Sequence, residues 1–254
     1  MKLLPLLTLF VASPAIAATE PSVATLYSGY YSTSGGYSDR FVVGTFGDLY
    51  SGAAGYHFDL AHLDREQNAQ YGAVGLSYAL SDKARAKVMV GSSTRNDNIL
   101  PSLFLLGSVQ FEPADKWVVT PQLIYRRYRQ GGQEIAPSIQ AAHYFNLAGD
   151  SGGYYVAQGD AGLSFTSGGN TGWSGGAGLT SLRKSGLNLG ANVRAGHMAY
   201  DSIIGTGVRS NFVGGGVSVG HRIGKSHELY VRADYSHTRF YDVTGAMLGL
   251  KIKL

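Results

Sequence analysis

Residues 187–197 read Leu-Asn-Leu-Gly-Ala-Asn-Val-Arg-Ala-Gly-His, and this stretch decides the fold class. Its odd-numbered positions as far as Ala195 hold leucine, alanine and valine, whereas its even-numbered positions hold asparagine, glycine and arginine. Successive side chains of a β-strand point to opposite faces of the sheet. One face of the predicted strand is therefore wholly apolar, and the other is polar or carries very small side chains.

The same alternation recurs along most of the chain. Apolar residues occupy every second position of residues 229–235 and of residues 248–254. Residues 74–80, 103–111 and 213–219 follow the same pattern, with glycine, alanine or serine common on the second face. Hardly any later segment shows the period of about 3.6 residues that marks an amphipathic helix. The sequence therefore predicts an all-β fold.

Clusters of turn-forming residues separate the alternating segments, for example Ser81-Asp82-Lys83 and Gly168-Gly169-Asn170. Dividing the chain at such clusters gives 14 predicted strands, an even number that puts both chain ends in the periplasm. The boundaries near residues 48–53 and 199–208 are less marked, so 12 strands remain the alternative. The predicted strands begin near residues 22, 38, 54, 69, 84, 100, 117, 134, 154, 173, 187, 208, 228 and 243.

The composition favours a membrane protein built from strands. Charged residues make up 15% of the chain, against about 25% in a typical soluble domain. The chain has 36 glycines and 17 tyrosines, and no later apolar run approaches the roughly 20 residues of a transmembrane helix. A membrane barrel combines these features, because its lipid-facing residues alternate with residues of the lumen.

A soluble, glycine-rich β-sandwich is the alternative, because its core strands also alternate. Two features favour the membrane. Charged residues and glycines are common on the polar faces, which suits a wet or crowded lumen. Aromatic residues also fall at the predicted strand ends, where a membrane barrel has its interfacial girdles. We therefore predict a transmembrane antiparallel up-and-down β-barrel, with girdle residues that include Phe111, Trp117, Tyr125, Tyr155 and Trp173.

The first residues have the pattern of a secretory signal peptide. Lys2 supplies a positive charge, an apolar stretch follows, and Ala15-Ile16-Ala17 offers the small residues that a signal peptidase reads. We expect residues 1–17 to be a cleaved signal peptide and residues 18–254 to be an outer-membrane β-barrel domain. The chain has no cysteine, which excludes a lipid-anchored lipoprotein.

An exported barrel is expected in the outer membrane of a Gram-negative bacterium. Its expected partners are outer-membrane lipid, lipopolysaccharide and, during biogenesis, the barrel-assembly machinery. The last predicted strand resembles the assembly signal of such barrels, with Leu254 in place of the usual terminal aromatic residue. Nucleic acid is not an expected partner, because the net charge of +4 is dispersed over alternating strand positions.

Three short motifs carry a family resemblance: Tyr71-Gly72-Ala73-Val74, Pro101 at the start of a predicted strand, and Leu123-Ile124-Tyr125-Arg126-Arg127-Tyr128. In these residues and in its length, the chain resembles the YaiO family of outer-membrane proteins over most of its mature part. The resemblance implies an outer-membrane barrel without a settled activity, and some relatives occur alongside exopolysaccharide machinery. It implies no catalytic residues, because the family's motif defines none.

A lipid-modifying outer-membrane enzyme is a further alternative, since such barrels use a serine and a histidine on one strand. Two residues on one face of a strand must be two positions apart, and none of the 7 histidines has a serine at that spacing. Ser236 and His237 are adjacent and so point to opposite faces. We therefore predict no enzyme, no catalytic residues and no cofactor. A dyad formed between different strands is invisible in the sequence and stays open.

Two other motifs resemble binding sites. Residues 220–226 resemble a phosphate-binding loop, but 3 residues separate the glycines where four are needed. His57 with Asp59, and His62 with Asp64, resemble two pairs of metal ligands. The five-residue offset places the pairs on opposite faces of one strand, so four ligands cannot converge. We predict no metal site, and a polar or interfacial contact for each histidine.

The polar faces of the predicted strands carry more cations than anions. Assigning these faces to the lumen places Arg126, Arg194 and further cations inside, opposed chiefly by Asp59, Asp160 and Asp234. The further cations fall near the strand ends that the topology makes periplasmic. They form a predicted basic ring at a narrow mouth, which consists of Arg85, Lys87, Arg222, Arg232, Lys251 and Lys253.

A basic ring at a narrow mouth concentrates anions and repels cations. The first hypothesis is therefore a narrow basic pore, or a docking barrel, linked to the transport of an anionic solute or of envelope exopolysaccharide. Alternatively, the cations pair with carboxylates or reach toward lipid phosphates. In that case the chain is a structural or interaction barrel without transport.

Overall fold

The computed structural model describes residues 21–64, 68–94, 100–129, 131–146, 153–201 and 207–254. The expected signal peptide, residues 1–17, lies outside the described residues. Within the described ranges, no helix is long and apolar enough to cross a membrane.

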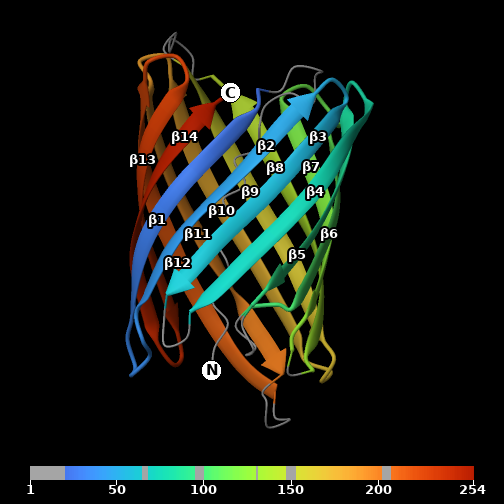
Figure 1. Ribbon diagram of the computed structural model, residues 1–254, viewed down its shortest axis with the longest axis vertical. Helices are drawn as coiled ribbons and strands as arrows, with labels where there is room; N and C mark the ends of the chain where they lie inside the picture. The colour runs from blue at the N-terminus through green and yellow to red at the C-terminus, as the bar shows by residue number, and fades with distance from the viewer. Residues whose placement is uncertain (1–20, 65–67, 95–99, 130, 147–152, 202–206) are drawn as a thin grey trace.

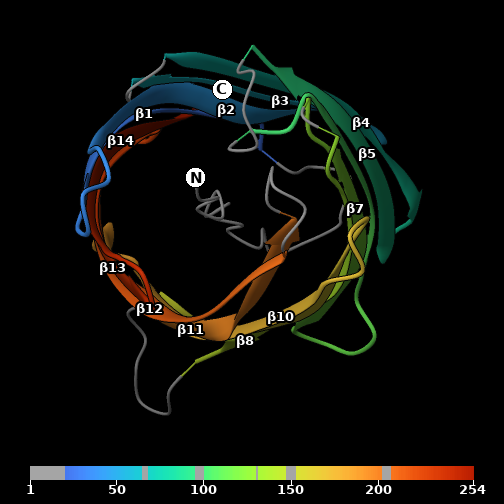
Figure 2. The same ribbon diagram turned by 90° about the horizontal axis from the view of Figure 1, so that it is seen from below.

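The strands close into one barrel, in which each strand pairs antiparallel with its neighbours in sequence and β1 pairs with β14 (Figure 1). Figure 2 looks along the barrel axis and shows the end of β11 and the start of β12, in orange, leaning inward over the opening. The strands are β1 (Val23–Thr33), β2 (Arg40–Ser51), β3 (Ala54–Asp64), β4 (Ala69–Ser81), β5 (Ala84–Ser93), β6 (Leu103–Phe111), β7 (Trp117–Arg127), β8 (Gln133–Phe145), β9 (Gly153–Thr166), β10 (Thr171–Arg183), β11 (Leu187–Asp201), β12 (Gly207–Ile223), β13 (His227–Thr238) and β14 (Asp242–Lys253).

The predicted antiparallel barrel of 14 strands is confirmed, and each strand begins within 3 residues of its predicted start. The alternative of 12 strands is wrong, because separate strands lie on both sides of each uncertain boundary. At the first boundary, β2 ends at Ser51 and β3 begins at Ala54. Gly52 makes this tight turn with a φ of 59°, a left-handed conformation that glycine adopts without steric cost.

Large apolar side chains project from the outer face of the barrel. Val193 on β11 is 64% exposed, and Leu80 on β4 is 62% exposed. Soluble monomers rarely expose contiguous apolar patches larger than a few hundred Å², whereas the hydrocarbon core of a membrane requires such a surface. A single closed sheet with its apolar face outside therefore excludes the soluble β-sandwich.

Aromatic side chains form a stacked row on the outer face, at the start of β7 and β9 and the end of β8. The ring centroids of Trp117 and His143 are 4.5 Å apart, and those of His143 and Phe145 are 5.8 Å apart. Phe145 continues the row to Tyr155 at 5.7 Å. Such rings combine an apolar body with a polar edge, which suits the membrane interface. The row therefore lies where the sequence places an interfacial girdle.

A small cluster of apolar side chains is buried inside the barrel. Val118, Ala142, Tyr144 and Val156 are buried together, and Leu182 packs against them. These residues lie on β7 to β10, at the end of the barrel that holds the start of β7. A barrel of 14 strands lies between the eight-stranded barrels that side chains fill and the larger ones that hold a water channel. This packing lines the wall formed by β7 to β10 at that end of the barrel.

Candidate functional site in the barrel lumen

The register of β12, β13 and β14 brings three residues of the predicted ring together. Arg222 pairs with Glu228, and Glu228 pairs in turn with Lys251. Paired residues of adjacent strands point to the same face, and this face is the inner one, because Lys251 also pairs with the buried Thr25 on β1. Lys253 follows two positions later at the end of β14. These three cations lie at the mouth where β1 begins and β14 ends.

No carboxylate neutralises these three residues, which we refer to as the mouth cations. Glu228 is the carboxylate nearest to them in register, and its Oε1 accepts a hydrogen bond from Nδ2 of Asn188 at 2.7 Å. Within the described part of the chain, the side chains of Arg222, Lys251 and Lys253 form no ion pair and no hydrogen bond. The mouth therefore carries three cations without ion-pair partners beside the single charge of Glu228, which leaves an excess of positive charge.

Arg85 adds a further cation on the opposite wall of the same mouth. Its strand, β5, lies seven places from β12 in the ring of 14 strands, directly across the lumen (Figure 2). Arg85 is 4% exposed. It donates to the carbonyl oxygen of Ala53 at 3.2 Å and to Oγ of Ser77 at 3.3 Å, and it lies 4.9 Å from the ring centroid of Tyr50. These contacting groups are neutral, so no carboxylate among the described residues pairs with Arg85.

Lys87, two positions further along β5, is compensated. Its Nζ lies 3.7 Å from Oδ1 of Asp48 on β2, and the same carboxylate pairs with Nδ1 of His57 on β3. His57 is buried, and its Nε2 has no hydrogen-bond partner among the described residues. Lys87 therefore lies near the mouth but adds little net charge to it.

Arg232 lies deeper in the lumen than the mouth cations and is also compensated. It pairs in register with Met247, whereas Lys251 pairs with Glu228. Its guanidinium contacts the carboxylate of Asp234, with Nη2 at 2.6 Å from Oδ1 and Nε at 2.8 Å from Oδ2. The two residues are two positions apart on β13 and so share the inner face. The structure thus separates Arg232 from the rest of the predicted ring.

The other cations predicted for the lumen also have acidic partners. Nη2 of Arg194 lies 3.1 Å from Oδ2 of Asp160, and Nη1 of Arg126 lies 3.0 Å from Oε2 of Glu134. The side chains of Arg194 and Asp160 are 28% and 30% exposed. Charges that remain this exposed lie in a lumen that water reaches, rather than in a packed core. Arg126 and Arg194 are therefore paired with carboxylates, as Arg232 is, whereas the mouth cations are not.

Three lumen carboxylates, those of Asp48, Glu134 and Glu228, were missed by the sequence analysis. Asp48 falls in the uncertain boundary near residues 48–53. Glu134 and Glu228 lie at strand starts, where the alternation has just begun. The signal that identifies them is parity: Glu228 is an even number of positions from Arg232 on the same strand, so it shares the inner face.

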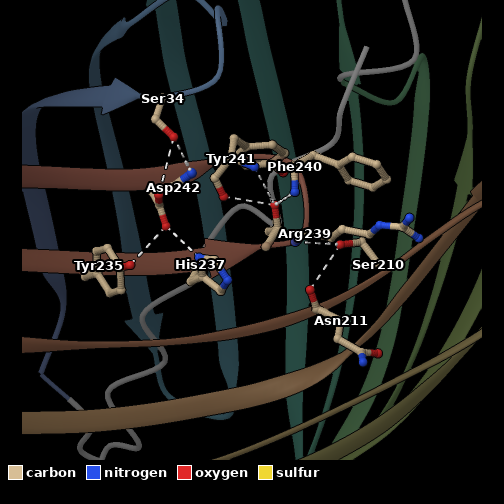
Figure 3. Close-up of polar contacts among 10 residues, drawn as sticks. Ser34, Ser210, Asn211, Tyr235, His237, Arg239, Phe240, Tyr241 and Asp242 are labelled. Carbon is tan, nitrogen blue, oxygen red and sulfur yellow. Dashed lines mark hydrogen bonds and ion pairs between the residues drawn. The ribbon is translucent and has the colours of Figure 1, made fainter.

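A serine, a histidine and an aspartate come together at the opposite mouth (Figure 3). Asp242 accepts hydrogen bonds from Nδ1 of His237 at 2.7 Å and from Oη of Tyr235 at 2.9 Å, and its backbone N–H donates to Oγ of Ser34 at 2.8 Å. In a hydrolase triad the histidine lies between the serine and the carboxylate. Here the aspartate lies between the other two, so the group has the order of a structural cluster and not of a triad.

The turn between β13 and β14 is fixed by neighbouring hydroxyl groups in the same view (Figure 3). The backbone N–H of Arg239 donates to Oγ of Ser210 at 3.3 Å, and Oγ of Ser210 donates to the carbonyl oxygen of Asn211 at 3.0 Å. The backbone N–H of Tyr241 donates to Oγ1 of Thr238 at 3.1 Å. These bonds satisfy backbone groups that a strand ladder no longer pairs.

The two His and Asp pairs on β3 lie on different faces, as predicted. His57 is buried on the inner face, and Asp59 shares that face because it follows two positions later. Asp64 pairs with Phe41, which is 44% exposed on the outer face, and His62 lies on that outer face as well. The separation onto two faces is therefore confirmed, and the four side chains do not converge.

No protein-family model and no curated protein sequence matches this chain. The YaiO assignment therefore stays a prediction. Among solved structures, the chain is similar to a bacterial polysaccharide outer membrane secretin, with a TM-score of 0.57, 6% identity, and coverage of 92% of this chain and 98% of that chain. It is also similar to the outer membrane protein Omp33 of Acinetobacter baumannii, with a TM-score of 0.58, 9% identity, and coverage of 92% and 99%. At such identities the likeness shows the fold, which is that of outer-membrane β-barrels.

Proposed function

We propose that this barrel is a narrow, anion-selective passage across the outer membrane, with its cationic mouth on the periplasmic side. The observation that carries the proposal is the distribution of charge. Arg222, Lys251 and Lys253 lack carboxylate partners within the described residues, and Arg85 faces them across the lumen. Arg126, Arg194 and Arg232 are each paired with a carboxylate, so these three cations add little net charge elsewhere in the lumen.

Such a mouth acts on passing ions through its electrostatic field. Charges in a constriction with low-dielectric walls concentrate counterions and exclude ions of the same sign. The screening length at physiological ionic strength is about 8 Å, so cations on opposite walls of a narrow mouth act on the same ion. An even number of strands puts the mouth with the start of β1 and the end of β14 in the periplasm.

The solutes that fit this field are anions, and acidic saccharides of the cell envelope are the class we propose. They carry carboxylates along a flexible, hydrated chain that a narrow lumen accommodates in an extended form. The resemblance to the YaiO family, some of whose members occur alongside exopolysaccharide machinery, fits the same class. One of the similar solved structures is named as a polysaccharide secretin.

Ion selectivity in planar bilayers tests this proposal. We expect the double variant Arg222→Ser, Lys251→Ser to move the reversal potential in a KCl gradient toward zero, because two uncompensated charges leave the mouth. The matched control is Arg183→Ser, which removes a cation from the same end of the barrel but from the outer face, next to Leu182 of the inner wall. An unchanged reversal potential in the double variant contradicts the proposal.

A structural or interaction barrel without transport is the alternative outcome of the same experiment. A folded barrel that gives no current at any potential has a closed lumen. In that case the mouth cations would bind a periplasmic partner instead of guiding ions through the barrel.

A further inference from the structure

Tyrosine and glycine alternate in one row across four adjacent strands of the inner wall. Tyr230 on β13 pairs with Gly249 on β14. Gly249 pairs on its other side with Tyr27 on β1, and Tyr27 pairs with Gly44 on β2. This row lies one inward position deeper than Lys251, so the two tyrosines follow directly behind the mouth cations.

The hydroxyl end of each ring lies beside a glycine of the neighbouring strand. A Cβ atom on Gly249 would lie 2.3 Å from Cζ of Tyr230, and a Cβ atom on Gly44 would lie 2.5 Å from Oη of Tyr27. The space that a side chain would occupy is therefore filled by the ring. Tyr27 and Tyr230 are half-buried on the inner face, so part of each ring remains exposed to the lumen.

Tyr31 repeats this arrangement further from the mouth. A Cβ atom on its partner Gly245 would lie 2.0 Å from Cδ1 of Tyr31. The guanidinium carbon of Arg40, its partner on β2, lies 4.5 Å from the ring centroid of Tyr31. Asp234 pairs with Gly245 on the other side. A carboxylate, an aromatic ring and a guanidinium thus lie side by side in one row, and we refer to Tyr230, Tyr27 and Tyr31 as the tyrosine track.

The hydroxyl groups of the track have unused hydrogen-bonding capacity. Within the described residues, the hydroxyls of Tyr27 and Tyr31 form no hydrogen bond, and that of Tyr230 contacts only Sδ of Met247, at 3.9 Å. A phenolic hydroxyl both donates and accepts, and a tyrosine that faces inward normally finds a partner for it. The track therefore offers polar groups to molecules in the lumen.

We propose that the tyrosine track is a binding surface for the sugar rings of an acidic oligosaccharide. A pyranose ring has an apolar C–H face and a rim of hydroxyl groups. The exposed parts of these half-buried aromatic rings match the C–H faces, and the phenolic hydroxyls match the rim. Lys251 at the mouth and Arg40 beyond Tyr31 supply charge for the carboxylates of the sugar. This inference rests on the proposed anion passage and deepens it, because it names the solute class and the wall that binds it.

Other anionic ligands fit the track less well. Inorganic anions need charge and hydrogen-bond donors, and they gain nothing from flat aromatic faces. A lipid or an apolar peptide needs a continuous apolar surface, whereas Asp234 and Arg40 interrupt the track at Tyr31. A hydrated chain of acidic sugars uses the rings, the hydroxyls and the cations together.

The test uses the refolded barrel in a planar bilayer, with a uronic acid hexasaccharide as the probe and neutral maltohexaose for comparison. We expect the uronic acid hexamer to interrupt the ion current at lower concentration than maltohexaose. In the double variant Tyr27→Ala, Tyr31→Ala, we expect the half-blocking concentration to rise at least about fivefold. The reason is that each contact between a tyrosine ring and a sugar ring raises the affinity for the hexamer a few-fold. The reversal potential in KCl should stay unchanged, because no charge is removed.

Two further variants separate the track from general effects on folding. Tyr56→Ala with Tyr78→Ala removes two tyrosines from the outer face, where they are 52% and 60% exposed, and should leave the blockade unchanged. Tyr27→Phe with Tyr31→Phe keeps the rings over their glycines and removes only the hydroxyls, so we expect a smaller rise than with alanine.

The outcomes distinguish this inference from the proposed function. If the wild-type barrel conducts chloride selectively but the hexamer blocks it no better than maltohexaose, the tyrosine track is not an acidic-saccharide site, although the anion passage stands. An unchanged blockade in the folded Tyr27→Ala, Tyr31→Ala variant also overturns it. A folded barrel that conducts no ions overturns the proposed function itself. Calorimetry then tests the tyrosine track: binding of the uronic acid hexamer supports it, and no binding overturns it.

Discussion

Tyr230 lies across Gly249 on the adjacent strand, with its Cζ only 2.3 Å from the point that a Cβ atom of residue 249 would occupy. The absence of a side chain at this one position keeps the ring against the wall. The same relation holds for Tyr31 and Gly245. The free width of the lumen on the side of β13, β14 and β1 therefore depends on glycines as much as on the tyrosines that line it.

Gly249→Ala should displace the Tyr230 ring toward the lumen. We expect a loss of about 1–3 kcal/mol in unfolding free energy, the usual effect of overpacking, and a smaller single-channel conductance. Denaturant unfolding in lipid vesicles and bilayer recording measure the two effects. The control is Gly107→Ala on β6, where a Cβ atom meets nothing within 4 Å. Equal stability of the two variants would show that the ring does not need the glycine.

Val193→Arg tests the membrane-facing surface. Val193 is 64% exposed on the outer face, and an arginine near the bilayer midplane of a barrel costs about 2–4 kcal/mol. We expect a loss of this size in unfolding free energy in vesicles, and little loss for Val193→Leu, which keeps the surface apolar. If arginine is tolerated as well as leucine, this face does not lie in hydrocarbon.

Asp48→Asn should raise the anion selectivity of the barrel. The substitution removes the carboxylate that lies 3.7 Å from Nζ of Lys87, so a further cation near the mouth loses its counter-charge. The reversal potential should move in the direction opposite to that of the Arg222→Ser, Lys251→Ser variant. Asp115→Asn, in the connection between β6 and β7, removes the same charge outside the strands. The account is contradicted if the two variants shift the potential equally.

Asp39, in the connection between β1 and β2, should stay ionised to a lower pH than an ordinary aspartate. A hydrogen bond from the Tyr30 hydroxyl, together with one from the backbone N–H of Thr33 at 2.9 Å, holds the pKa of the Asp39 carboxyl below its ordinary value. These bonds therefore stabilise the fold above the ordinary pKa of a carboxyl, and the stabilisation is lost as the pH falls through the lowered pKa.

Tyr30→Phe should raise the pKa of Asp39 toward its ordinary value, because the strongest hydrogen bond to the carboxylate is lost. Carbon NMR of the carboxyl group during a pH titration measures the shift. Tyr235→Phe removes a comparable hydroxyl from Asp242 instead and should leave the titration of Asp39 as it is. If Asp39 titrates at the same pH in the wild type and in the Tyr30→Phe variant, the Tyr30 hydroxyl does not lower the pKa of Asp39.

The strands could be predicted from the sequence because the period of two is a local property. The alternation of residues 187–197 identifies the inner and outer faces of β11 without any knowledge of its neighbours. The pair of Arg232 and Asp234 was accessible for the same reason, because two residues on one strand at this spacing share a face. Soft boundaries between strands shifted the predicted starts by at most 3 residues.

Contacts between strands could not be predicted, because they depend on register. Arg194 on β11 reaches Asp160 on β9, beyond the intervening β10. The row of Tyr230, Gly249 and Tyr27 joins residues from opposite ends of the chain, which meet only because β1 and β14 close the barrel. Division of the predicted ring into mouth cations and neutralised cations follows from the same register.

The most direct test of the account is the reversal potential of single wild-type channels, recorded from the refolded barrel in a planar bilayer across a KCl gradient. The uncompensated charge of Arg222, Lys251 and Lys253 predicts stable currents that reverse near the equilibrium potential of chloride. Currents that reverse near the potassium potential would contradict the account, as would a correctly folded barrel that stays silent.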